Sequence, residues 1–181
     1  MNALDILRGF AENNAWSNLR LLRACEQLSP EEYTATRTSF FPSIRLTLEH
    51  ILLVDLYYLD GLVHGGRSAK AREDVAALNT FAAVRGAQAE TDARLVAFVA
   101  GLADEAALKQ VVDLQRRDHV QHEKVGDVLM HLFQHQIHHR GQVHAMLAGT
   151  PVKPPQLDEF FMAEEAPLRA HELRDLGLPA R

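Results

Sequence analysis

A bundle of four α-helices is the fold class that this sequence predicts. Over four long stretches, apolar residues recur every three or four positions, a period that places them on one face of a helix. Proline or glycine ends or follows several of these stretches, and the connections are short to medium, as in helices that pack on one another. We therefore expect an all-α chain with one domain over residues 1–181. Its core would cover about residues 2–150, followed by a C-terminal strap over residues 151–181.

The first helix is predicted over Asn2–Leu28, which has an apolar stripe of helical period. Asn14 and Asn18 lie inside this stripe, where leucine would be expected. Buried amides need hydrogen-bond partners, so these two either contact a neighbouring helix or face a polar cavity. The following residues, Ser29–Glu32, begin with serine and proline and carry glutamate three positions after the serine, which predicts a second, short helix or turn.

The next long helix is predicted over Pro42–His64 and ended by the glycines at 65 and 66. Its inward face carries His50 and Tyr57. A lone histidine on an apolar face is more simply interpreted as a core residue with satisfied hydrogen bonds. His50 becomes a candidate metal ligand only because other histidines need a partner.

A polar segment, Arg67–Ala77, is expected to be a loop before a third long helix over Leu78–Leu102. The charged residues of that helix are interpreted as a solvated face: Arg85, Glu90, Asp92 and Arg94. Residues 103–124 are less regular, and a short helix or an extended crossing fits them. Their two histidines, His119 and His122, have charged neighbours and are expected to be exposed.

The fourth helix is predicted over residues 127–149 and holds five of the ten histidines. These are His131, His135, His138, His139 and His144. Residues four apart are neighbours on a helix, so His135 and His139 can reach one ion, with His131 on the same stripe. The same helix contains Arg140, which needs an acid or carbonyl partner if buried, and Gly141, which is expected to permit a close helix crossing.

Together, His50, His135 and His139 would supply three nitrogens to one metal ion. Three protein ligands with open positions are typical of a reactive metal site, whereas structural zinc sites use four. Imidazole suits zinc, nickel, copper and iron, and the sequence does not choose among them. His131 is either a fourth ligand or a hydrogen-bond partner of a ligand, and we favour the second role. The alternative is that all these histidines are core or surface residues without a metal.

The composition argues against several classes of protein. The formal net charge is −5 and no basic stripe occurs, so a nucleic-acid partner is not expected. The most apolar run contains several charged residues and does not predict a membrane span. A single cysteine, Cys25, and an N-terminus without a signal-peptide pattern are consistent with a reducing compartment, so we expect a cytoplasmic protein.

The stretch His135–Gln142, HQIHHRGQ, resembles the H-x-x-x-HRGQ signature of the DinB/YfiT-like family of metal-dependent proteins. The asparagines of the first helix, the segment around His50 and the tail sequence PPQLDEF agree with this resemblance, which covers about residues 2–162. It implies an up-down-down-up four-helix bundle, often a homodimer. It also implies that His50, His135 and His139 bind one divalent ion.

The resemblance also implies a function. Some relatives transfer low-molecular-weight thiols such as bacillithiol or mycothiol, or use mycothiol in isomerisation. We therefore expect a metal-dependent thiol S-transferase or hydrolase that acts on a small molecule with zinc, nickel or iron, and with a thiol as cosubstrate. His131 and Gln142 would support the ligands, and Asn18 and Tyr57 would line the cavity. The alternative is a non-catalytic stress-response protein that binds a metal or another ligand.

Overall fold

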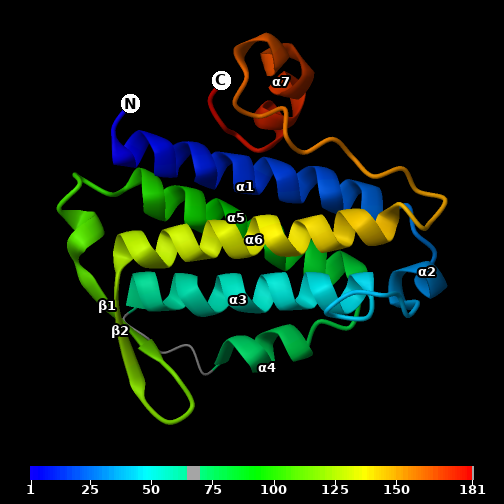
Figure 1. Cartoon of the computed structure of the whole chain (residues 1–181), viewed down its shortest axis with the longest axis horizontal. Coiled ribbons are helices and arrows are strands. Elements are labelled where there is room, and N and C mark those ends of the chain that lie inside the picture. The colour runs from blue at the N-terminus through cyan, green and yellow to red at the C-terminus, as the bar shows by residue number, and fades with distance from the viewer. Residues whose placement is uncertain (65–69, 181) are drawn as a thin grey trace.

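The computed structural model describes residues 1–64 and 70–180, and it is mostly helical (Figure 1). The described residues form seven α-helices, two short 3-10 helices and one β-hairpin. The α-helices are α1 (Ala3–Cys25), α2 (Pro30–Thr34), α3 (Ile44–His64), α4 (Ala71–Ala76), α5 (Phe81–Ala100), α6 (Val125–Leu147) and α7 (Ala166–Asp175). The strands are β1 (Val111–Gln115) and β2 (Val120–Lys124). Within the described ranges, no helix is both long enough and apolar enough to cross a membrane.

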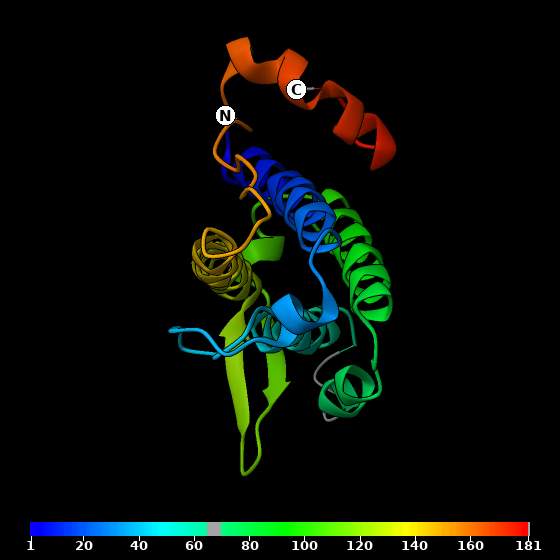
Figure 2. The same ribbon diagram turned by 90° about the vertical axis from the view of Figure 1, so that its right-hand side faces the viewer.

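The four long helices are the ones that the sequence predicts, each within a few residues of its expected ends. Helix α1 packs on α5 and α6, and α3 packs on the same two helices (Figure 2). Side chains cap the first turns of α1 and α5: the Asn2 side chain accepts from the Asp5 amide, and Thr80 accepts from the amide of Ala83. The predicted short helix is α2, with Ser29 as its cap.

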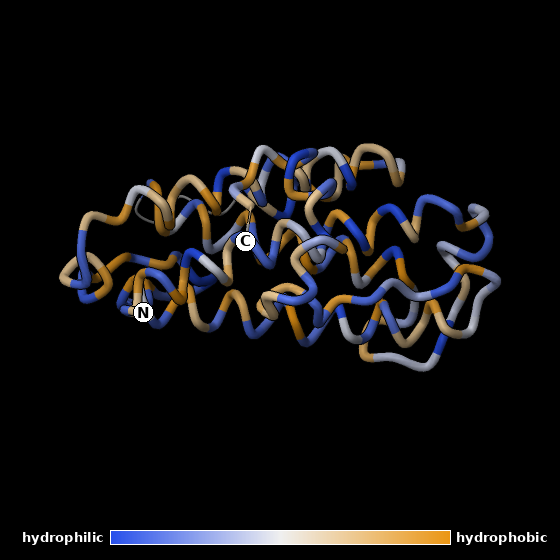
Figure 3. Tube along the Cα trace, turned by 90° about the horizontal axis from the view of Figure 1, so that it is seen from above, coloured by the Kyte–Doolittle hydropathy of each residue, from blue (hydrophilic) through white to orange (hydrophobic). Residues whose placement is uncertain are grey.

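The core consists of two apolar clusters between the long helices and a smaller one outside them. Hydrophobic and hydrophilic residues are interspersed along the trace of the long helices (Figure 3). The cluster nearer the hairpin includes Leu59, Leu95, Leu129 and Leu132, all of them almost fully buried. The other cluster lies toward α2 and includes Leu21 and Ile51 among others. Burial of these side chains drives the helices together.

The hairpin occupies part of the segment that the sequence leaves undecided. Strands β1 and β2 are antiparallel, and the turn between them is closed by a hydrogen bond from the Arg116 amide to the carbonyl of His119. Leu114 of β1 is buried directly against Gly61 of α3. A Cβ atom at Gly61 would lie 2.4 Å from Leu114 Cδ2, so a larger residue would force the buried Leu114 side chain to move. The glycine therefore permits the close packing of the hairpin on α3.

The strap crosses the outside of α1 and ends in α7, on the side of the molecule away from the hairpin (Figures 1 and 2). Trp16 of α1 is fully buried beneath it, and its Nε1–H donates to Glu172 of α7 at 2.7 Å. The Nε of Arg20 also donates to Glu172, and Phe160 packs on the Trp16 ring. One buried carboxylate thus ties the strap to α1.

Two predictions about local structure are wrong. The segment expected to be a loop, Arg67–Ala77, contains α4, because Ala71 and Val75 lie four positions apart and are both buried. One apolar pair is too short a pattern to reveal a helix. Gly141 does not mark a close crossing, since a Cβ atom there would meet nothing within 4 Å. The predicted glycine stop at residues 65 and 66, and residues 67–69, lie outside the described residues.

Candidate metal centre

The structure brings the three predicted ligands together from two neighbouring helices. His50 comes from α3, and His135 and His139 are one turn apart on α6. One ring nitrogen from each lies within 4.8 Å of the other two, and the Nε2 atoms of His50 and His135 are 3.0 Å apart. Two nitrogens that share a metal ion at about 2.1 Å lie roughly 3.0–3.4 Å from each other, so the pair His50 and His135 has the spacing of two ligands of one ion, with His139 beside it.

The environment of the cluster favours neutral imidazoles. Burial, and to a lesser degree the neighbouring His139, lowers the pKa of His50 to about 4. Burial and the other histidines lower the pKa of His135 to about 3, and burial also lowers the pKa of His139. Neutral imidazole is the form that binds metal ions, so near neutral pH these rings need not lose a proton before they bind.

Neighbouring side chains fix the orientation of the rings. The Oε1 of Gln142 lies 2.8 Å from the Nδ1 of His139, so Nδ1–H can donate to the amide and leave Nε2 free for a metal. The Nε2 of Gln142 lies 3.1 Å from the Nε2 of His138, which holds the amide in turn. The ring of Phe41 packs 4.3 Å from that of His50 and covers one side of the cluster.

The other residues expected near the site lie in different places. His131 is exposed and packs edge-on against Tyr58, with its ring 6.2 Å from that of His135. It lines the pocket beside the cluster, as does Tyr57. Asn18 does not line this pocket, since it is buried on α1 and takes part in a separate polar network.

That network is fully buried, and each of the four long helices contributes to it. Its members are Asn14, Asn18, Asp55, Gln88, Asp92, Gln136 and Arg140. Arg140 donates to the side-chain oxygens of Asn14, Asn18 and Gln136. Asp92 accepts from both asparagines and from Gln88, while Asp55 accepts from Gln88 and Gln136. Arg140 and the asparagines therefore have the buried partners that the sequence requires of them.

Burial determines the protonation of the network. Burial raises the pKa of Asp55 to about 6, and burial together with the charge of Asp55 raises that of Asp92 well above its ordinary value. Burial lowers the pKa of Arg140 to about 10, although the charges of both carboxyl groups act to raise it. Because Gln136 and Arg140 follow His135 and His139 directly in α6, this network fixes the rotation of the helix that presents both ligands.

The prediction that Asp92 belongs to a solvated face is wrong. It is 3% exposed and accepts hydrogen bonds from three side chains, those of Asn14, Asn18 and Gln88. The sequence around it is rich in charge, and nothing local separates Asp92 from its exposed neighbours Glu90 and Arg94. A weak signal was present: Gln88 and Asp92 are four apart and therefore on one side of α5.

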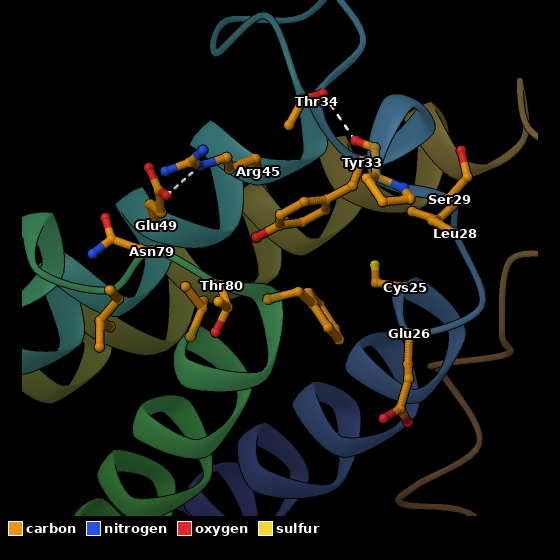
Figure 4. A pocket seen from close by; sticks show the side chains of 14 residues that line it. Cys25, Glu26, Leu28, Ser29, Tyr33, Thr34, Arg45, Glu49, Asn79 and Thr80 are labelled. Carbon is orange, nitrogen blue, oxygen red and sulfur yellow. Dashed lines mark hydrogen bonds and ion pairs between the residues drawn. The ribbon is translucent and has the colours of Figure 1, made fainter.

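A second pocket lies where α1, α2, α3 and α5 meet (Figure 4). It has a volume of about 450 Å³ and is lined by Cys25, Tyr33 and the ion pair of Arg45 with Glu49. Burial raises the pKa of the Cys25 thiol to about 12, so the thiolate that a nucleophile needs does not form near neutral pH. We therefore assign no chemistry to Cys25.

Fold and site together define a class of protein: a helical protein in which facing helices hold three histidines in the arrangement of a metal site. The DinB family model matches residues 2–172, and the chain belongs to the DinB family. The chain is also 25% identical over 149 residues to a protein of Bacillus subtilis (strain 168) described as Protein DinB. That match covers 75% of this chain and 81% of the relative.

Proposed function

We propose that this protein is a metal-dependent enzyme, either a thiol S-transferase or a hydrolase that acts on a small molecule. His50, His135 and His139 would bind one divalent ion, zinc or nickel in the first place and iron otherwise. One observation carries the proposal: His50 and His135 also line a cavity of about 710 Å³. A metal site that faces a cavity of this size can receive a substrate, whereas a structural site is closed.

Each neighbouring residue has a role in this proposal. Gln142 holds His139 with its Nε2 toward the cluster, and the buried network keeps α6 in the rotation that points His135 the same way. Phe41 excludes water from one side of the rings. A bound divalent ion would supply Lewis acidity to a thiol or water that entered from the cavity. Tyr57 and His131 would form the cavity wall beside it.

The proposal also covers architecture and assembly. Residues 1–181 would be one cytoplasmic domain, with an up-down-down-up bundle over about residues 2–150 and the strap over residues 151–181. The contacts of α1 and α3 with both α5 and α6 support the bundle. A homodimer is supported by an exposed apolar groove of about 620 Å³ between α1 and α6, lined by Ile6, Met130 and Ile137 among others. Sedimentation of the wild type and of Ile137→Glu tests this, and a wild type that sediments as a monomer would contradict it.

The decisive experiment is elemental analysis of the protein purified without an affinity tag, beside His50→Ala. About one divalent ion per chain in the wild type, and none in the variant, is expected for a three-histidine site. The control is His171→Ala, which removes an exposed histidine of α7 and should retain the metal.

Two results would contradict the proposal at different levels. A wild type without metal after reconstitution with zinc, nickel and iron would exclude the metal site. A stoichiometric metal with no turnover of electrophiles or esters, with or without a thiol, would favour the non-catalytic alternative. Turnover that needs both metal and thiol is the result expected for an S-transferase.

A further inference from the structure

The cavity beside the histidines has two chemically different ends. At one end lie His50 and His135, and at the other lies the hairpin, with Gln115, Arg116 and Arg117. Helix α4 closes a further side with Arg72. Both α4 and the hairpin extend on the side of α3 away from α1 (Figures 1 and 2). This cavity is therefore lined by α3 and α6 on one side and by elements outside the four long helices on the other.

The charge of the cavity is opposite to that of the chain. The chain has 24 acidic and 19 basic residues, yet the described residues that line the cavity include three arginines and neither aspartate nor glutamate. Arg72 and Arg117 are exposed, and no described residue forms an ion pair with either. Clustered cations in a concave, partly apolar site attract and concentrate anions.

Arg116 is the arginine that the structure holds in place. Its Nε donates to Gln121 Oε1 at 2.7 Å, and its guanidinium carbon lies 5.1 Å from the centre of the Tyr57 ring. The Nη2 is 3.4 Å from the hydroxyl of Tyr58. Glu123, whose charge acts on Arg116, accepts a hydrogen bond from Gln121 instead of forming an ion pair with the guanidinium.

One edge of this guanidinium is therefore available to a ligand. No described residue accepts a hydrogen bond from Nη1 of Arg116. A stacked, oriented guanidinium with free N–H groups matches the two oxygens of a carboxylate. The apolar part of a ligand would contact Tyr57, Leu53 and Val54, which line the same cavity.

We propose that this cavity binds small carboxylates with an apolar or aromatic body, and that Arg116 receives the carboxylate while Arg72 and Arg117 add to its attraction. This inference rests on the proposed function only in that the other end of the ligand would face the histidines. The hairpin, positioned by the contact between Gly61 and Leu114, would thus determine which molecules the metal centre meets.

The test compares phenylacetate and phenylbutyrate with their uncharged amides by isothermal titration calorimetry. The carboxylates should bind at least about tenfold more tightly than the amides, the range of a charge-assisted hydrogen bond. Arg116→Gln should remove this preference, and Arg116→Lys, which retains charge but loses the planar fork, should retain part of it. The control Arg94→Gln removes an exposed arginine of α5 that does not line the cavity and should bind like the wild type. Circular dichroism and thermal melting establish that each variant is folded.

The same titrations on metal-loaded wild type and on His50→Ala separate this inference from the proposed function. Carboxylate binding to His50→Ala that Arg116→Gln abolishes supports the arginine site, even if the wild type proves to hold no metal. Equal binding of carboxylate and amide would overturn the inference. Binding that requires metal and is unchanged in Arg116→Gln would overturn it too, since the carboxylate would then bind the ion and not the guanidinium.

Discussion

Metal binding should release almost no protons from His50 and His135 at about pH 6, although histidines are the proposed ligands. A histidine with the ordinary pKa of 6.5 is about three-quarters protonated at that pH, so two such ligands would release about 1.5 protons per ion. Burial lowers the pKa values of His50 and His135 to about 4 and about 3, which leaves them almost entirely neutral. The pKa of His139 is lowered as well.

The measurement is calorimetric titration of the metal-free protein with zinc at about pH 6 in several buffers that differ in ionisation enthalpy. The slope of observed heat against that enthalpy gives the number of protons released. A zinc-bound water with a pKa of ~7 adds only about a tenth of a proton at this pH. His171→Ala should give the same slope as the wild type, and His50→Ala should give no binding heat. Release of about 1.5 protons or more would refute the reasoning from burial.

The remaining predictions concern stability and are measured by chemical denaturation. Gly141→Ala should raise the free energy of unfolding by about 0.5–1 kcal/mol, because the new Cβ meets open space. Gly61→Ala should lower it by about 1–3 kcal/mol, because the new Cβ overpacks against Leu114 of the hairpin. Equal effects of the two substitutions would contradict the contact between Gly61 and Leu114. Asp55 has a folded pKa of about 6, above its ordinary 3.8. Between these pH values the folded state retains a proton that the unfolded state has lost. The free energy of unfolding therefore falls as pH rises, by at most about 3 kcal/mol. Asp55→Asn should remove that part of the slope, and an unchanged slope would refute the assignment. Glu172→Ala should lower the free energy of unfolding by about 1–3 kcal/mol, because the Trp16 N–H loses its buried partner. It should also make the strap more sensitive to protease. A strap that stays resistant would contradict its anchoring through Glu172.

The sequence allowed the long helices and the histidine cluster to be predicted because both depend on local spacing. His135 and His139 are neighbours by helical geometry alone, and His50 required only that two inward faces meet. The pairing of α3 with α6, which brings His50 to within 3.0 Å of His135, is a tertiary contact that periodicity does not specify.

The features that the sequence did not predict depend on contacts between segments far apart in the chain. Asp92 is buried because Asn14 and Asn18 meet it from α1, and its local sequence is that of an exposed helix. The hairpin has no clear alternation of apolar and polar residues, since only Leu114 of its strands is fully buried. The proposed role of Arg116 depends on the position of the hairpin, so the sequence could not predict it either.

The hairpin that packs on Gly61 through Leu114 separates the residues proposed to select the substrate from the residues proposed to hold the metal. The proposed metal ligands belong to α3 and α6, which the buried network holds, whereas the hairpin turn carries none of that network and contacts α3 only through Arg116, at Tyr57 and Tyr58, among the contacts described above. Substitutions in the turn, residues 116–119, are therefore expected to change which molecules enter without moving the histidines. Relatives with the same three histidines but different turns would then share a metal centre and differ in substrate selectivity. Exchanging only this turn between relatives would be a direct way to alter that selectivity.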